Sequence, residues 1–176
     1  MISLSASKNP TMDLIRRWSL QLDNTIDSEI ELAKPDGSKV PGLLISHGQH
    51  KILIAVEGQD YITVTYRIDL LETDQDKLAK MDSQDYMKLT NIIKRALIAG
   101  RSGFNFALRP KTDIIKSIII VQRMKVSQTD PSTFNHFSDS IQEMVNEGFM
   151  VAMILGATFR ESGAQSISSA PESMYR

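Results

Sequence analysis

The chain has 176 residues, a hydrophobic fraction of 41% and a net charge of -1 at pH 7, which are ordinary values for one globular domain. It contains no cysteine, and this excludes disulfide bonds, thiolate metal sites and cysteine nucleophiles. The longest apolar run, Phe149 to Ala157, is far shorter than the roughly 20 residues that cross a membrane. We therefore expect a soluble, cytoplasmic domain over residues 10–159, with an N-terminal tail over 1–9 and a disordered C-terminal tail over 160–176.

The first predicted element is a helix that begins at Asn9 and Pro10, since Asn caps helices well and Pro suits the first helical position. Its apolar residues recur at helical spacing, at Met12, Ile15, Trp18 and Leu22. Residues 25–40 show no clear pattern apart from a tight turn over residues 34–37. Three strands follow, over residues 42–46, 51–57 and 61–68. Their connections are too short for crossovers, so we expect an antiparallel meander.

The second half of the chain continues with a polar, acidic segment over residues 69–81, which indicates a loop or a weak first helical turn. A helix is expected from Asp82 or Ser83 to about Ala99, where Gly100 ends it. A β-hairpin and a last helix complete the chain, with strands over 104–108 and 116–126 and a helix from Asp130 to about Leu155. This order of helix, three strands, helix, two strands and helix predicts an α+β fold, in which helices cover one face of a five-stranded antiparallel sheet.

Three segments carry a resemblance to known proteins. They are Leu14-Ile15-Arg16-Arg17-Trp18, Phe104-Asn105-Phe106-Ala107-Leu108-Arg109-Pro110 and the passage from Ile118 to Phe137, in which Asp130-Pro131-Ser132-Thr133-Phe134 leads into the last helix. With these segments the chain resembles the small α/β fold of the type III secretion chaperones and, more narrowly, an archaeal family of uncharacterised proteins with that fold. The resemblance covers roughly residues 10–158. It implies a homodimer and a surface that binds extended segments of partner proteins, and it carries over no catalytic residue.

Charge is distributed unevenly along the chain. Residues 57–85 carry eight acidic and three basic side chains, whereas residues 86–126 carry nine basic side chains and one acidic side chain. Such asymmetry is typical of proteins with an anionic partner. The candidate anion-binding patch consists of Lys94, Arg95, Arg101, Arg123 and Lys125. Because a helix dipole also accounts for the first three cations, a nucleic-acid-binding regulator is our alternative function and not our first.

No local motif for catalysis or metal binding stands out. His47 and His50 form an H-x-x-H pair that could hold zinc together with His136, but two solvated histidines in a turn are the simpler interpretation. The acidic cluster over residues 72–76 lacks the spacing of a calcium loop. Residues 100–103 are Gly-rich but follow a helix, whereas phosphate-binding loops precede one. We therefore expect no metal, no cofactor and no enzyme activity, although a site assembled from dispersed residues would leave no local motif.

The end of the last helix is apolar all round, where a surface helix would show a stripe. One face can pack on the sheet, and the other is either buried in the same domain or covered by a partner. The candidate interface consists of Phe149, Met150, Val151, Met153 and Ile154. We therefore predict a non-enzymatic protein-interaction or chaperone-like module that acts as a homodimer. An enzyme with a dispersed site is the second alternative, after the nucleic-acid-binding regulator.

Overall fold

The computed structural model describes residues 9–34 and 36–161, and the expectations for residues 1–8 and 162–176 lie outside this part of the chain. The elements follow in the order α1 (Pro10–Gln21), β1 (Thr25–Ala33), β2 (Lys39–His47), β3 (His50–Glu57), β4 (Tyr61–Asp69), α2 (Glu72–Lys80), α3 (Ser83–Ile98), β5 (Gly103–Leu108), β6 (Ile115–Lys125) and α4 (Ser132–Glu161). Within the described residues, no helix combines the length and the apolar character that crossing a bilayer requires.

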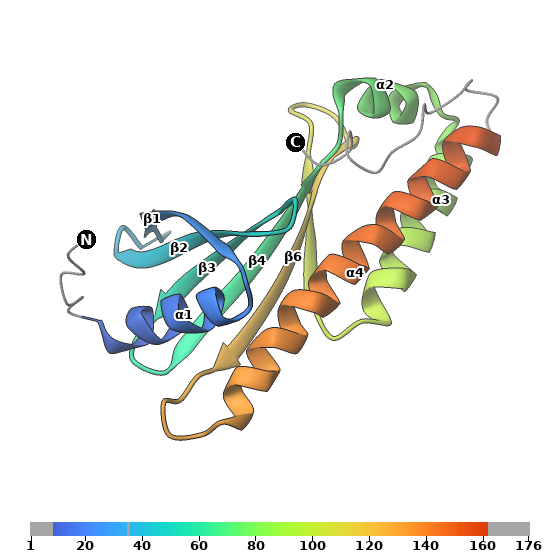
Figure 1. Ribbon diagram of the computed structural model, residues 1–176. Helices are drawn as coiled ribbons and strands as arrows, with labels where there is room; N and C mark the ends of the chain where they lie inside the picture. The colour runs from blue at the N-terminus through green and yellow to red at the C-terminus, as the bar shows by residue number, and fades with distance from the viewer. Residues whose placement is uncertain (1–8, 35, 162–176) are drawn as a thin grey trace. The chain divides into compact units, whose positions relative to one another are not determined.

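The six strands form one antiparallel sheet in the order β1-β2-β3-β4-β6-β5 (Figure 1). The mixed α+β class and the predicted order of the elements are confirmed. After β4 the chain forms α2 and α3, enters the end of the sheet as β5, and returns beside β4 as β6. Strand β1 and helix α2 are additions to the predicted elements.

Strand β1 lies in the segment where the sequence shows no clear pattern. Its half-buried side chains are Ile26, Ser28, Ile30 and Leu32, and the exposed ones between them include Asp27, Glu29 and Glu31. Acidic residues are rare in strands, so the composition of β1 does not indicate a strand although its apolar and acidic residues alternate. Pairing with β2 stabilises the strand. The predicted turn joins the two strands, because the Lys34 N–H donates to the Ser38 carbonyl at 2.7 Å and Gly37 has a φ of 82°.

Helix α2 occupies the segment for which the sequence predicts a loop or a weak first helical turn, and the loop prediction was wrong. Leu78 is the one buried apolar side chain of α2, so the segment has no apolar stripe to reveal it. Polar contacts hold the helix instead. Gln75 Nε2 donates to the Leu70 carbonyl at 2.8 Å, and Lys77 Nζ lies 3.0 Å from Asp74 Oδ1.

The chain's contacts divide it into two compact units, and the boundary crosses β4, β6 and α4. The first unit comprises Met1–Thr65 and Arg123–Ile141, and α1 lies across one face of its strands (Figure 1). Asn9 caps α1, since its Oδ1 accepts the N–H groups of Thr11 at 3.0 Å and Met12 at 3.2 Å. The buried core of this unit includes Met12, Leu14, Ile15, Trp18, Leu43, Ile45, Ile52, Ile54, Ile62, Val64 and Phe137.

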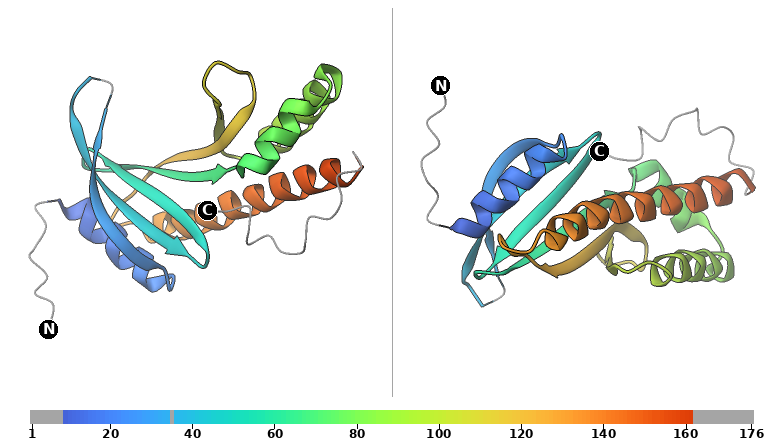
Figure 2. Two further views of the ribbon diagram at one scale, coloured as in Figure 1. Left: turned by 90° about the horizontal axis from the view of Figure 1, so that it is seen from above. Right: turned by 60° about the horizontal axis from the view of Figure 1, so that its bottom comes forward.

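The second unit comprises Tyr66–Gln122 and Gln142–Arg176. In it α3 runs beside the C-terminal part of α4 (Figures 1 and 2). Asp82 caps α3 by accepting the N–H groups of Gln84 at 2.6 Å and Asp85 at 3.1 Å. The buried core of this unit includes Tyr66, Ile68, Leu78, Leu89, Ile93, Leu97, Ile118, Ile120, Val151, Leu155 and Phe159.

Candidate interaction surface

The C-terminal part of α4 exposes an apolar stripe. Met153 is 74% exposed, Phe149 is 40% exposed, and Ala157 is exposed as well. These three residues are four apart, so they lie on one side of the helix and cover about 12 Å of its length. We call them the α4 stripe. Met153 is the most exposed large apolar side chain of the described residues.

The structure separates the five predicted interface residues by their burial. Phe149 and Met153 lie in the α4 stripe, and Met150 and Ile154 beside it are half-buried. Val151 has no exposed surface and belongs to the buried core of the second unit. It lines a small hollow together with Leu155, Ile68 and Leu70, because residues four apart on a helix face the same way.

Three of the predicted anion-binding cations belong to the second unit. Lys94 Nζ lies 5.9 Å from the ring centre of Phe106, a cation–π distance. Arg95 is exposed, and Arg101, with a side chain that is 86% exposed, lies 3.9 Å from the Glu143 carboxylate. This group therefore keeps most of its charge in solvent.

The other two predicted cations belong to the first unit. Arg123 Nε lies 3.2 Å from Glu57 Oε2, and its guanidinium stacks 4.9 Å from the ring centre of Tyr61. Lys125 is exposed. Because Arg123 already has a carboxylate and a ring as partners, it offers less to an external anion than its sequence context indicates.

The two histidines of the H-x-x-H pair face each other across the turn between β2 and β3. His47 Nδ1 lies 2.7 Å from Asn24 Oδ1, and burial, followed by the nearby His47, lowers the pKa of His50. His136 is exposed on α4. Among the described residues, no three histidine, aspartate or glutamate side chains converge on a common point where a metal would sit. In the acidic cluster, Asp76 pairs with Arg109 at 3.0 Å.

A hollow of about 470 Å³ opens at the start of α1 in the first unit, and the sequence held no signal for it. Asn9, Thr11, Asp60 and Ser127 line it among others, so hydroxyl, amide and carboxylate groups are present. Its volume falls within the range of small-molecule sites. The Thr11 hydroxyl donates to the Gln59 carbonyl and thereby fixes one wall.

Glu147 of α4 is a buried carboxylate that sequence reasoning also missed. It is 6% exposed, its Oε2 has no hydrogen-bond partner, and burial raises its pKa above the ordinary value. The hydroxyl and N–H of Ser102 act against that rise by donating to the carboxylate, and the neighbouring Glu143 adds to it. The hydrogen bonds from Ser102 to Glu147 therefore hold the turn before β5 against α4, and they require a carboxylate to be buried.

Replacing this carboxylate by an amide, Glu147→Gln, should change how stability depends on pH. Since the folded-state pKa is raised, the stabilisation is present below the ordinary carboxyl pKa and is lost as pH rises through the folded value. We expect the stability of Glu147→Gln relative to the wild type to increase from pH 4 to pH 7 in urea denaturation. The hydrogen bond from Lys51 lowers the pKa of Asp27, so carboxylates of this kind stabilise the protein more as pH rises. They are present in both proteins, and their effect cancels when the two stabilities are subtracted. A difference that stays constant with pH would contradict the prediction.

Comparison with known proteins identifies the family. The model of the uncharacterized conserved protein family DUF2299 matches residues 11–155. The chain belongs to DUF2299. No curated protein is detectably similar to it in sequence.

Two solved structures resemble this DUF2299 protein. One is an uncharacterized protein from Methanothermobacter thermautotrophicus, with a TM-score of 0.70 and 12% identity over 85% of this chain and 99% of that chain. The other is YbjN from E. coli, described as a candidate transcription regulator, with a TM-score of 0.47 and 14% identity over 86% of this chain and 94% of that chain. The first shows a shared fold, and the second is too weak a likeness to use.

The DUF2299 match spans nearly all of the described elements. It begins within α1 and ends at Leu155, so it includes Phe149 and Met153 of the α4 stripe and leaves out Ala157. The cationic residues of both units and the buried Glu147 also fall within it. Most residues of the surfaces described above therefore lie in the part of the chain that matches DUF2299.

Proposed function

We propose that this DUF2299 protein is a non-enzymatic protein-interaction module of the cytoplasm and that it pairs with a second copy of itself through the α4 stripe. The observation that carries the proposal is the 74% exposure of Met153 beside the partly exposed Phe149 on one side of a long helix. Methionine suits such a surface, because its flexible thioether adapts to a partner. The absence of cysteine fits a reducing compartment.

A second copy fits the stripe because a helix can pack on its own symmetry mate. In a two-fold dimer each contact occurs twice, so one exposed methionine contributes two buried side chains. Burying a methionine contributes about 1.5–3 kcal/mol. The likeness to secretion chaperones, which rests on sequence patterns, points in the same direction, since it implies a homodimer and a protein-binding role.

Sedimentation velocity of the full chain tests this pairing. We expect a dimer at micromolar concentration, and Met153→Glu should shift it to a monomer. The dimer dissociation constant should rise by at least about 100-fold, because two methionine contacts of about 1.5 kcal/mol each are lost. A matched control is Leu20→Glu on α1, which also places a charge at an exposed apolar position, 56% exposed, but in the first unit.

The control variant should sediment as the wild type does. A wild-type chain that is monomeric at 100 µM, or a dimer that Met153→Glu leaves intact, would contradict the proposal. Circular dichroism of each variant separates loss of pairing from loss of folding.

Specific contacts of the structure argue against the two alternative functions, a nucleic-acid-binding regulator and an enzyme. A nucleic-acid-binding regulator would use cations of which Arg123 is already bound by Glu57 and Tyr61. An enzyme would need a reactive group in a cavity, and the hollow at the start of α1 places Asp60 in solvent among neutral side chains. We therefore propose the interaction module first and retain the other two as alternatives.

A further inference from the structure

Strand β5 leaves one side of the sheet open. It is the last strand in the sheet order, with β6 as its neighbour, and no backbone hydrogen bond of the described residues joins its outer side to another segment. Natural edge strands usually carry charges, prolines or bulges that discourage pairing. The opposite edge strand, β1, follows this rule, since it carries three acidic residues and a bulge. Strand β5 has the sequence Gly-Phe-Asn-Phe-Ala-Leu, with neither charge nor proline.

The register shows which backbone groups face outward. The Leu70 N–H donates to the Lys116 carbonyl at 2.9 Å, so the backbone of Lys116 and of alternate residues after it bonds toward β4. The residues between them, including Ile119, bond toward β5, and Ile119 is paired with Asn105. The backbone N–H and C=O groups of Phe104 and Phe106 therefore point to the free edge.

Apolar side chains of α3 flank this edge. Met87, Asn91, Lys94 and Ile98 are spaced four, three and four residues apart, so they share one stripe of the helix. The contact of Lys94 with Phe106 places that stripe on the β5 side. Met87 is 58% and Ile98 69% exposed, and Leu108 at the end of β5 is 47% exposed. An added strand would meet apolar side chains beside the open backbone.

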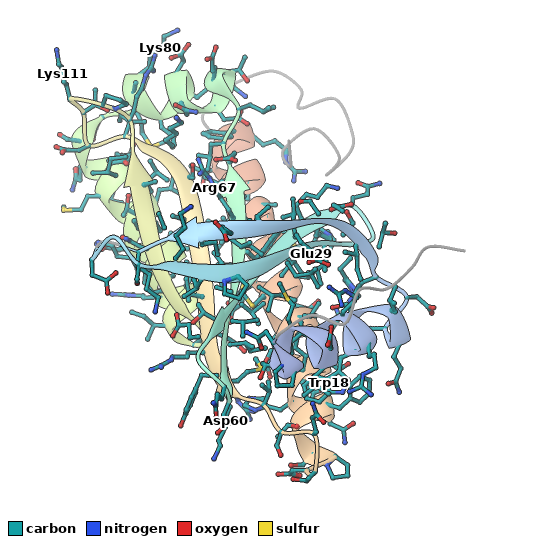
Figure 3. All side chains as sticks on the ribbon, turned by 90° about the vertical axis from the view of Figure 1, so that its left-hand side faces the viewer. Trp18, Glu29, Asp60, Arg67, Lys80 and Lys111 are labelled. Carbon is teal, nitrogen blue, oxygen red and sulfur yellow. The ribbon has the colours of Figure 1, made fainter. Side chains whose placement is uncertain are left out.

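The flanks of the edge are basic. Residues 86–112 contain six basic side chains and no acidic one. Within the described part of the chain, Lys94, Arg95 and Lys111 have no ion pair, and Lys111 projects from the tip of the turn after β5 (Figure 3). Two copies of β5 would bring like charges together, which opposes pairing of this edge with itself. The charge instead favours an acidic occupant.

We propose that the free edge of β5 binds an extended, acidic segment of a partner protein, in which acidic residues alternate with apolar ones. The segment adds a strand to the sheet by bonding to the backbone of Phe104 and Phe106. Its apolar side chains contact Met87 and Ile98, and its carboxylates lie near Lys94, Arg95 and Arg101. A nucleic acid fits less well, because phosphates cannot donate to the outward carbonyls and the Phe104 and Phe106 rings of the edge strand are half-buried.

A labelled peptide tests this proposal. The probe is a fluorescein-tagged nine-residue peptide that alternates glutamate with valine or isoleucine, and its binding to the full chain is followed by fluorescence anisotropy. We expect saturable binding that weakens as salt rises. The double variant Lys94→Glu/Arg101→Glu should weaken it by about tenfold or more. The matched control Lys39→Glu/Lys125→Glu reverses two exposed cations of the first unit and should bind as the wild type does.

Amide exchange gives a readout that charge attraction alone would not produce. The amides of Phe104 and Phe106 should exchange quickly in the free chain and become protected in the complex, whereas the amide of Asn105 is protected in both. A peptide of the same charge with prolines at alternate positions should not bind, because it cannot form a strand. The Met153→Glu variant should bind the probe as the wild type does, so the outcome of this test does not depend on whether the protein dimerises.

Three outcomes would overturn the proposal. One is the absence of binding at millimolar peptide, and another is binding without protection of Phe104 and Phe106. The third is displacement of the peptide by a 12-nucleotide oligouridylate with higher affinity, which would assign the basic flank to nucleic acid.

Discussion

Truncating the single tryptophan, Trp18→Ala, should destabilise the protein by about 3–5 kcal/mol. Trp18 is 8% exposed, and its ring centre lies 5.8 Å from that of Phe134 and 5.6 Å from that of Phe137. The variant therefore loses the largest side chain of the first unit and two aromatic contacts, and it leaves a cavity between α1 and α4. Guanidinium denaturation followed by circular dichroism measures the change, since tryptophan fluorescence is lost with the residue.

The control for this prediction lies on the same helix. Leu20 is 56% exposed, and Leu20→Ala should change the free energy of unfolding by less than about 0.5 kcal/mol. Equal losses for the two variants would contradict the prediction, because alanine forms helices better than either residue and the packing of Trp18 would then contribute no more than the exposed Leu20 does.

Adding one methyl group to α4 should have opposite effects at two glycines. A Cβ atom at Gly148 would lie 2.5 Å from Tyr66 Cε1, and Tyr66 is 1% exposed and cannot move aside. At Gly156 the nearest atom to such a Cβ is Arg160 Nη2 at 3.9 Å. Alanine raises helix stability by about 1 kcal/mol over glycine, whereas overpacking costs about 1–3 kcal/mol.

We therefore expect Gly148→Ala to lose up to about 2 kcal/mol of stability and Gly156→Ala to gain about 1 kcal/mol. Thermal and urea denaturation of the two variants, measured side by side, give the sign of each change. Stabilisation by both substitutions would mean that Tyr66 yields to the new methyl group and that the contact between β4 and α4 is loose.

Periodicity in the sequence sufficed for the elements with strong apolar patterns. The helices α1, α3 and α4 and the strands β2 to β6 were predictable from spacing, caps and turn residues. Strand β1 was not predicted because its acidic residues disfavour a strand despite the alternating pattern. Helix α2 was not predicted because Leu78 is its one buried apolar residue. Both elements depend on contacts with segments elsewhere in the chain, which a local pattern does not contain.

The candidate surfaces were predictable only in part, for a similar reason. From Phe149 to Leu155 every residue of α4 is apolar, so composition cannot tell the exposed Met153 from the buried Val151. The exposure of β5 at the edge follows from strand order, which depends on where β6 pairs. A lone glutamate such as Glu147 looks like any surface residue until the turn before β5 packs over it.

The discontinuity of the first unit has a consequence for synthesis on the ribosome. Its first 65 residues form α1 to β3 and the start of β4, but Phe134 and Phe137, which cover Trp18, come about 70 residues later. At roughly 5–20 residues per second, the ribosome needs about 4–15 seconds to make the missing part. Throughout that interval the nascent chain presents the Trp18 side of α1 to solvent without its covering aromatic residues. Ribosome-bound chains that end near residue 65 should therefore be more open to proteases than chains that extend well beyond residue 141.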